Sequence, residues 1–224
     1  MCRPVAEWAK VSDHLRGGIN MPQNEPVLPL RERVAILVID MQHDFIDEDG
    51  PIPCHGARSI VPKLRELLDF ARGSQIPIIY TQEVHRSSKV DFGRELDYGE
   101  TLHCVEGSKG VEIIPDLCPQ GTDYVLVKRR YSGFFATDLD LLLKGLGVDT
   151  VVITGVATDV CVRATAQDAM QHDYRVVVPR ECVAGTNADR HEAALENIAY
   201  VFGKVQALSE VLKALRAPEV HDVR

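Results

Sequence analysis

The alternation of short apolar runs with amphipathic helical patterns is the feature that most constrains how this chain can fold. Runs rich in β-branched residues occur at Val34–Ile39, Pro77–Thr81, Tyr124–Val127, Thr150–Thr154 and Arg175–Val178, with a weaker run near Tyr200–Val205. Strands that are apolar on both faces and alternate with helices belong to a parallel sheet covered on both sides. The sequence therefore predicts a three-layer α/β/α domain with a six-stranded, mainly parallel, Rossmann-like sheet.

Helical periodicity fills most of the intervals between these runs. The predicted helices begin at Ser59, at Thr137 or Asp138, at Val160, at Asp189 and at Leu208. Each start combines a capping residue or a change of period with apolar residues three and four positions apart. The first four helices lie between successive strands, and the helix from Leu208 closes the domain.

The chain of 224 residues is predicted to hold one large domain, at residues 33–218. Residues 1–32 are interpreted as an extended N-terminal arm with a short helical turn around residues 5–15, and residues 219–224 as a tail. Apolar residues make up 45% of the chain and charged residues 26%, a balance that excludes disorder over most of it. The longest apolar run is too short to cross a bilayer and no apolar signal segment follows Met1, so we expect a cytoplasmic protein without a membrane partner.

Charge and cysteine spacing exclude two further classes. The net charge is −8, and no basic cluster is longer than Lys128–Arg130, which argues against nucleic acid as a partner. The 6 cysteines are widely and irregularly spaced without a C-x-x-C pair, which indicates neither a disulfide framework nor a structural zinc site. We therefore predict no cofactor.

The segment from residue 84 to residue 119 breaks the alternation. It is rich in glycine, histidine and charged residues. A loop of this length in a compact domain is usually functional. We expect it to overhang the active site, although the His103–Cys104 pair within it is not assigned a catalytic role.

Three reactive side chains follow predicted strands, and each also has a structural interpretation. Asp40 comes directly after the first strand, Lys128 after the third and Cys161 a short turn after the fourth. Taken singly, Asp40 could cap a turn, Lys128 could be a solvated charge at a strand end, and Cys161 could pack in the core. Ligands of open parallel sheets bind beyond the carboxyl ends of the strands, so together they predict a nucleophile, a cation and a carboxylate at one edge.

Cys161 is the candidate nucleophile. The segment Gly155–Cys161 is a tight turn from a strand into a helix. The unpaired N–H groups and positive end of that helix, with the Lys128 ammonium, are expected to lower the pKa of the thiol, and Asp40 can then carry protons.

Three segments in this order, Val38–Phe45, Lys128–Phe134 and Gly155–Val162, resemble the isochorismatase-like cysteine hydrolase superfamily. That group includes nicotinamidases, N-carbamoylsarcosine amidases, and biuret and ureidoacrylate amidohydrolases. The resemblance covers about residues 34–205 and implies a catalytic triad of Asp40, Lys128 and Cys161. It also implies a cis peptide between Val156 and Ala157, and an oxyanion hole formed by the backbone N–H groups of Ala157 and Cys161.

The resemblance implies hydrolysis of a small amide or carbamoyl compound through a thioester, with release of ammonia or an amine. The isochorismatases proper cleave a vinyl ether and lack the cysteine, so Cys161 favours C–N hydrolysis. Relatives are commonly homodimers or homotetramers, which makes a homo-oligomer the expectation. Three alternatives stay open: a nicotinamidase, a vinyl ether hydrolase and a non-catalytic oligomeric protein that has kept the fold.

Further positions are candidates for substrate contact by the same resemblance. They are Phe45, His85, Arg130, Tyr131 and Val156. Phe45 could equally belong to the core, and Arg130 and Tyr131 could pack against neighbouring residues without contacting substrate.

A metal site is the weaker reading of one cluster. Nicotinamidases place an Asp-x-His pair and a further histidine after the second strand. Here Glu83, His85 and Asp91 occupy the corresponding positions. Such a set could bind a divalent ion. Because two of the three residue types differ, we predict that no metal is bound and that Glu83 and His85 shape the rim of the pocket.

Overall fold

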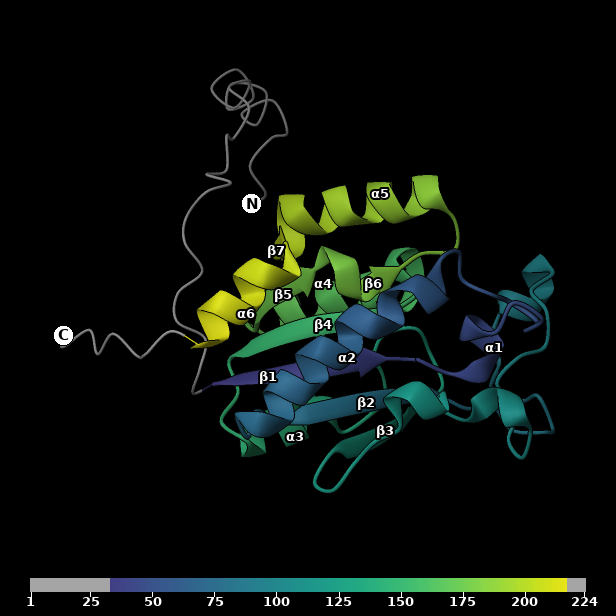
Figure 1. Cartoon of the computed structure of the whole chain (residues 1–224). Helices are drawn as coiled ribbons and strands as arrows, with labels where there is room; N and C mark the ends of the chain where they lie inside the picture. The colour runs from purple at the N-terminus through teal and green to yellow at the C-terminus, as the bar shows by residue number, and fades with distance from the viewer. Residues whose placement is uncertain (1–32, 217–224) are drawn as a thin grey trace, which may run out of the picture.

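The computed structural model describes residues 33–216, so the predicted N-terminal arm (residues 1–32) and tail lie outside the described residues (Figure 1). Its centre is one parallel sheet. The strands are β1 (Val34–Ile39), β2 (Ile78–Glu83), β3 (Tyr124–Lys128), β4 (Thr150–Val156), β5 (Arg175–Pro179), β6 (Val183–Ala184) and β7 (Lys204–Gln206). They run in the order β3-β2-β1-β4-β5-β7, with β6 paired to β4.

The prediction of an α/β/α domain with a parallel sheet is confirmed, but the strand count is seven within residues 33–216 rather than six. The additional strand, β6, has two residues. An element of this length leaves no periodic signal in a sequence.

Helices cover both faces of the sheet (Figure 1). They are α1 (His43–Ile46), α2 (Ala57–Gly73), α3 (Leu139–Gly145), α4 (Arg163–Gln171), α5 (Ala188–Asn197) and α6 (Leu208–Arg216). In β1, Ile36 and Val38 pack with α2 and α6, whereas Leu37 and Ile39 pack with α3, α4 and α5. This alternation arises because successive side chains of a strand point to opposite faces.

Two predicted caps are wrong. The helix α2 begins at Ala57, and the hydroxyl of Ser59 instead donates to the carbonyl of Gly56 at 2.7 Å. Asn187, not Asp189, caps α5, because its side-chain oxygen accepts the backbone N–H of Arg190 at 2.9 Å. Either residue type is a good cap, so the choice depends on where the chain leaves β6.

The loop of residues 84–119 is fastened to the carboxyl edge of the sheet. Its local structure is three short turns of 3₁₀ helix, at Glu95–Tyr98, Lys109–Val111 and Pro115–Leu117. Buried Gln42 connects the loop to β2. Its amide nitrogen donates to the carbonyl oxygen of Glu83, at the end of β2, at 2.8 Å and to that of Val111, in the loop, at 3.1 Å. No helix within residues 33–216 is both long and apolar enough to cross a membrane.

Candidate active site

The carboxyl edge of the sheet gathers residues from four neighbouring strands. Asp40 follows β1, Glu83 ends β2, Lys128 ends β3, and Cys161 lies in a π-helical turn (Thr158–Val162) after β4. Parallel register aligns these ends, since Glu83 is directly opposite Lys128.

Gly155 allows β1 and β4 to come together at this edge. Its φ of 98° is a conformation that favours glycine, and a Cβ there would stand 2.1 Å from the carbonyl oxygen of Ile39. Any side chain would push β4 away from β1. The close approach therefore sets where Asp40 and the turn that carries Cys161 lie relative to each other.

The structure brings the three predicted triad residues together. Lys128 Nζ lies 2.8 Å from Asp40 Oδ2 and 3.6 Å from Cys161 Sγ. All three residues are buried, with exposed fractions of 0% for Asp40, 1% for Lys128 and 5% for Cys161. Thr81 orients the carboxylate, because its hydroxyl donates to Asp40 Oδ1 at 2.7 Å and accepts the Asp40 N–H at 3.2 Å.

A fourth residue, Glu83, belongs to the same cluster. Its Oε2 lies 2.6 Å from Lys128 Nζ and 3.8 Å from Cys161 Sγ. The reactive atoms of Asp40, Glu83 and Cys161 lie within 4.8 Å of one another. From the sequence, Glu83 was expected at the pocket rim or in the weaker alternative metal set, not beside Lys128; its position at the end of the second strand was the available signal.

Burial controls the protonation of this cluster. It raises the pKa of Asp40 against the opposing effect of Lys128. Burial also raises the pKa of the Cys161 thiol, again opposed by Lys128 and reinforced by Asp40 and Glu83. The expected lowering of the thiol pKa is therefore not found: the resting site holds a protonated thiol beside a carboxylate whose proton affinity is also increased.

A pocket of about 450 Å³ opens above Cys161. Its lining includes Phe45, Tyr131, Val156 and Ala157, all singled out from the sequence, and the peptide between the last two is cis. Glu95, Glu100 and His103 of the long loop complete one side.

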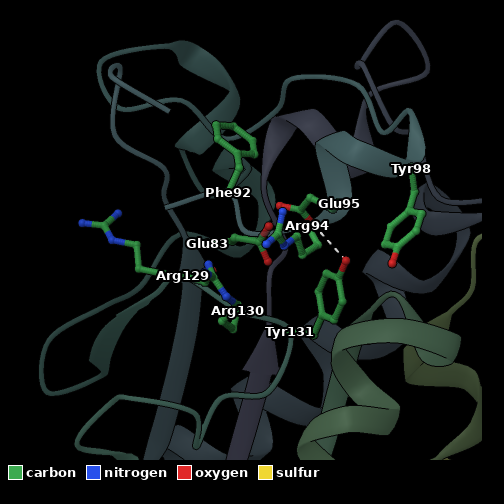
Figure 2. Close-up of a pocket in the computed structure, with 8 residues that line it drawn as sticks. All are labelled: Glu83, Phe92, Arg94, Glu95, Tyr98, Arg129, Arg130 and Tyr131. Atoms are coloured by element: carbon green, nitrogen blue, oxygen red, sulfur yellow. Dashed lines mark hydrogen bonds between the residues drawn. The ribbon is translucent and has the colours of Figure 1, made fainter. Parts of the chain in front are cut away.

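Arg130 and His85 lie elsewhere. Arg130 lines an adjoining pocket of about 220 Å³ that shares Glu83, Glu95 and Tyr131 with the first (Figure 2). The hydroxyl of Tyr131 donates to Glu95 Oε2 at 2.9 Å at this junction, the contact dashed in Figure 2. His85 is buried, lines neither pocket and is stacked on Phe92 with ring centroids 3.9 Å apart.

Glu83, His85 and His103 form a group whose donor atoms could hold a divalent ion. Glu83 Oε1 lies 3.2 Å from His85 Nε2 and 3.0 Å from His103 Nε2. His103 Nδ1 contacts Thr101 O at 2.7 Å, the kind of outer contact that directs the other ring nitrogen toward a metal. One carboxylate and two imidazoles suit zinc and related ions, so the residues fit a metal.

Asp91 of the predicted alternative set does not join this group. Its Oδ1 lies 3.7 Å from His85 Nδ1, the far side of the ring, and its carboxylate accepts from Arg86 Nη1 at 2.6 Å. His103 stands in its place. The sequence signal for His103 was a histidine late in the long loop, which carries no information on how that loop folds back.

Comparisons with known proteins identify the family of the chain. The isochorismatase domain family model matches residues 34–210. The maleamate amidohydrolase of Pseudomonas putida is 34% identical over 186 residues, 81% of this chain and 86% of the relative. An isochorismatase-like hydrolase structure from Alkaliphilus metalliredigens has 41% identity and a TM-score of 0.75, covering 81% of this chain and 98% of that chain. Pyrococcus horikoshii pyrazinamidase in complex with zinc has 33% identity and a TM-score of 0.72, covering 78% and 99%.

The parallel sheet covered by helices on both faces, together with the relatives that match this chain, defines a hydrolytic enzyme. The chain belongs to the isochorismatase family of hydrolases, which confirms the resemblance drawn from its three sequence segments.

Proposed function

We propose that the protein is a cysteine-dependent amidohydrolase that cleaves a C–N bond of a small amide or carbamoyl compound. The observation that carries the proposal is the convergence of buried Asp40 and Lys128 with Cys161, the residue of the three that lines the pocket of about 450 Å³. The name of the Pseudomonas putida relative supports amide hydrolysis.

The reaction begins with proton transfer. Asp40 accepts the Cys161 thiol proton as the sulfur attacks the carbonyl carbon, and the oxyanion is stabilised by the backbone N–H groups of Ala157 and Cys161. Asp40 then gives the proton to the leaving nitrogen, so that ammonia or an amine departs and a thioester remains. Asp40 next takes a proton from water, which attacks the thioester and releases the acid, while the proton returns to the sulfur.

Lys128 and Glu83 control the charge of this step. Lys128 stays protonated, because Asp40, Cys161 and Glu83 raise its pKa although burial opposes them. Its ammonium stabilises the thiolate as it forms. Glu83 also contacts that ammonium, at 2.6 Å, and the two carboxylates together keep it within reach of both reacting groups.

A metal-assisted amidase of the nicotinamidase type is the second candidate. The observation that favours it is the Glu83, His85 and His103 group beside the pocket. A divalent ion held there would supply a Lewis acid that polarises the substrate. The carboxylate and the two imidazoles would hold the ion, while the transfers at Asp40 and Cys161 stay as described.

The quaternary state belongs to the same proposal. The edge strand β3 exposes Tyr124, Val125 and Val127, with exposed fractions of 39%, 49% and 48%. An apolar edge of this kind is normally covered, and a homodimer or homotetramer would cover it. Sedimentation velocity of the purified chain tests this part, and a monomer would count against it. Cytoplasmic location likewise stays an expectation.

The test of the proposed function is an ammonia-release screen over amides, ureido acids and nicotinamide, with and without a chelator. We expect turnover of at least one amide without added metal, and a mass increase on Cys161 when the reaction is quenched with acid. Turnover of nicotinamide alone, abolished by the chelator, would favour the second candidate. If the protein is folded but shows neither turnover nor a covalent adduct, the result would support a non-catalytic protein.

A further inference from the structure

The turn that carries Cys161 has a wider hydrogen-bond pattern than an α-helix. In the π-helical turn Thr158–Val162, the carbonyl oxygen of Ala157 accepts the N–H of Val160 at 3.0 Å and that of Val162 at 3.1 Å. An α-helix would direct the N–H of Cys161, four residues on, to this carbonyl. Because Val162 takes that place, the N–H of Cys161 is kept out of a bond that would compete with an oxyanion.

Two side chains of this turn fasten it to the start of α5. Asp159 Oδ1 accepts the backbone N–H of Thr186 at 2.8 Å, and Asp159 Oδ2 accepts the Thr186 hydroxyl at 2.5 Å. The buried hydroxyl of Thr158 lies 2.9 Å from His191 Nδ1. A π-helical turn is an uncommon conformation that is frequent at functional sites. These contacts from outside the turn therefore stabilise a conformation that the turn would not adopt by itself.

The strand pairing next to the turn explains why a side chain makes this connection. The strands β4 and β6 are parallel, and their last pair is Val156 with Ala184. Beyond it, β4 continues into the turn and β6 into Gly185. A Cβ at Gly185 would stand 2.9 Å from Asp159 Oδ1, so glycine allows the carboxylate to lie against the backbone. The Asp159 carboxylate thus connects the two chain segments where the strand pairing stops.

We propose that Asp159 is a positioning residue of the reaction: its two bonds to Thr186 hold the turn in the π-helical form, which leaves the Cys161 N–H available to the oxyanion. This inference rests on the proposed function, because it concerns the oxyanion hole of that mechanism. Among the described residues, Thr186 lines the pocket and Asp159 does not, so Asp159 acts through the backbone of the turn. Without the two bonds, we expect the turn to relax toward an α-helix, in which the Cys161 N–H pairs with Ala157 O.

The test compares two reactions of Cys161 that differ in whether an oxyanion forms. p-Nitrophenyl acetate transfers its acetyl group to the sulfur through a tetrahedral oxyanion and releases p-nitrophenolate. Iodoacetamide alkylates the sulfur by direct displacement of iodide, without an oxyanion. Both reactions pass the thiol proton to Asp40, so the ratio of the two rates isolates the oxyanion. Since loss of one oxyanion donor lowers acyl transfer about 10²- to 10³-fold, Asp159→Ala should lower the ratio of acetylation to alkylation about tenfold or more.

Both rates are measured on the Cys161 peptide by mass spectrometry, and three further variants separate the hydrogen bonds from charge and folding. Asp159→Asn accepts the Thr186 N–H and donates to the Thr186 hydroxyl oxygen, so it should restore most of the ratio. Thr186→Val keeps the N–H and loses the hydroxyl, so it should give an intermediate ratio, and it decides the question if Asp159→Ala does not fold. Asp168→Ala is the matched control and should keep the wild-type ratio, because this aspartate of α4 accepts from Gln171 at 3.3 Å.

A wild-type ratio in Asp159→Ala and Thr186→Val, whether the two rates are unchanged or fall together, would overturn the inference, because a merely structural loosening affects both reactions. A ratio as low in Asp159→Asn as in Asp159→Ala would also overturn it, since charge and not hydrogen bonding would then be the cause. So would a wild-type Cys161 that is alkylated but never acetylated. Failure of the wild type to hydrolyse any amide counts instead against the proposed function, because neither reaction of Cys161 requires amide turnover.

Discussion

Glu83 Oε2 lies 2.6 Å from Lys128 Nζ, closer than the 2.8 Å between that nitrogen and Asp40 Oδ2. One buried ammonium therefore faces two carboxylates, and a Cys161 thiolate would be a third anion beside it. Burial, reinforced by these two carboxylates and opposed by Lys128, raises the pKa of the Cys161 thiol, so the reaction needs a base within reach of the sulfur.

Glu83→Gln should lower kcat about 10- to 100-fold with a smaller effect on KM, because the neutral amide no longer holds the Lys128 ammonium in place. Steady-state kinetics on the best substrate of the screen measure this. Glu106→Gln, a carboxylate that accepts from Ser87 in the same long loop, is the matched control and should retain wild-type rates. Equal kcat in Glu83→Gln and wild type would show that Glu83 is a bystander.

Cys161→Ser should lower kcat at least 10²-fold while leaving the melting temperature close to that of the wild type. A hydroxyl in this position is far too weak an acid for Asp40 to deprotonate, yet its volume is similar. Asp40→Asn should also abolish turnover and slow alkylation of Cys161. Retention of more than about a tenth of the wild-type rate in Cys161→Ser would exclude covalent thiol catalysis.

The other cysteines provide controls for that result. Cys118 is exposed, and Cys54 and Cys104 are buried. Burial raises the pKa of Cys54 to about 12, so its thiol is not activated even though it lines the pocket. Serine at each of these three positions should leave most of the activity.

The acid side of the pH profile should reflect Asp40. Burial raises the pKa of this carboxyl above its usual 3.8, and the carboxyl must be deprotonated to accept the thiol proton. Activity is therefore lost as the pH falls through this raised value, and kcat/KM should decline at a pH above that of an ordinary aspartate. Glu83→Gln removes a negative charge that also raises the pKa of Asp40, so its residual activity should persist to lower pH. A profile that stays flat to pH 4 would contradict this assignment.

The fold could be predicted from the sequence where periodicity was long enough to read. The run Val34–Ile39 coincides with β1, and the C-terminal helical pattern with α6. The two-residue strand β6 and the capping of α5 by Asn187 were missed. Both depend on the path that the chain takes between the end of β5 and the start of α5. Local sequence periodicity does not predict that path.

The site divides in a similar way. Asp40, Lys128 and Cys161 could be proposed because each follows a strand, and parallel strands deliver their ends to one edge. His103 could not, because its place depends on the path of a loop that returns to Glu83 across 20 positions of sequence. The pKa of Cys161 was expected in the wrong direction, because the sequence reveals a nearby cation but not the complete burial of the thiol.

The group formed by Glu83, His85 and His103 should hold almost no metal at pH 6. His103 lies between two acceptors, Thr101 O and Glu83 Oε1, so both ring nitrogens carry protons when the glutamate is ionised. Lys128 and His103 hold the pKa of Glu83 well below its usual range although burial opposes them, and the two hydrogen bonds raise the pKa of His103 against burial. An imidazolium has no free electron pair for a metal. We therefore expect less than about 0.1 zinc, iron or manganese per chain after purification at pH 6 without added ions, measured by elemental analysis.

A proton and a metal ion compete for the same nitrogen of His103, so the affinity for metal should depend on pH. The proton is bound below the raised pKa of His103 and lost as the pH rises through it, so added zinc should bind more tightly at pH 8 than at pH 6. His103→Phe should remove this pH dependence, whereas His172→Phe, an exposed histidine on the far end of α4, should not. Close to one metal per chain at pH 6, with activity lost on chelation, would show that the ion and not the imidazolium is the native partner of Glu83. The metal-assisted mechanism would then be the better account of the site.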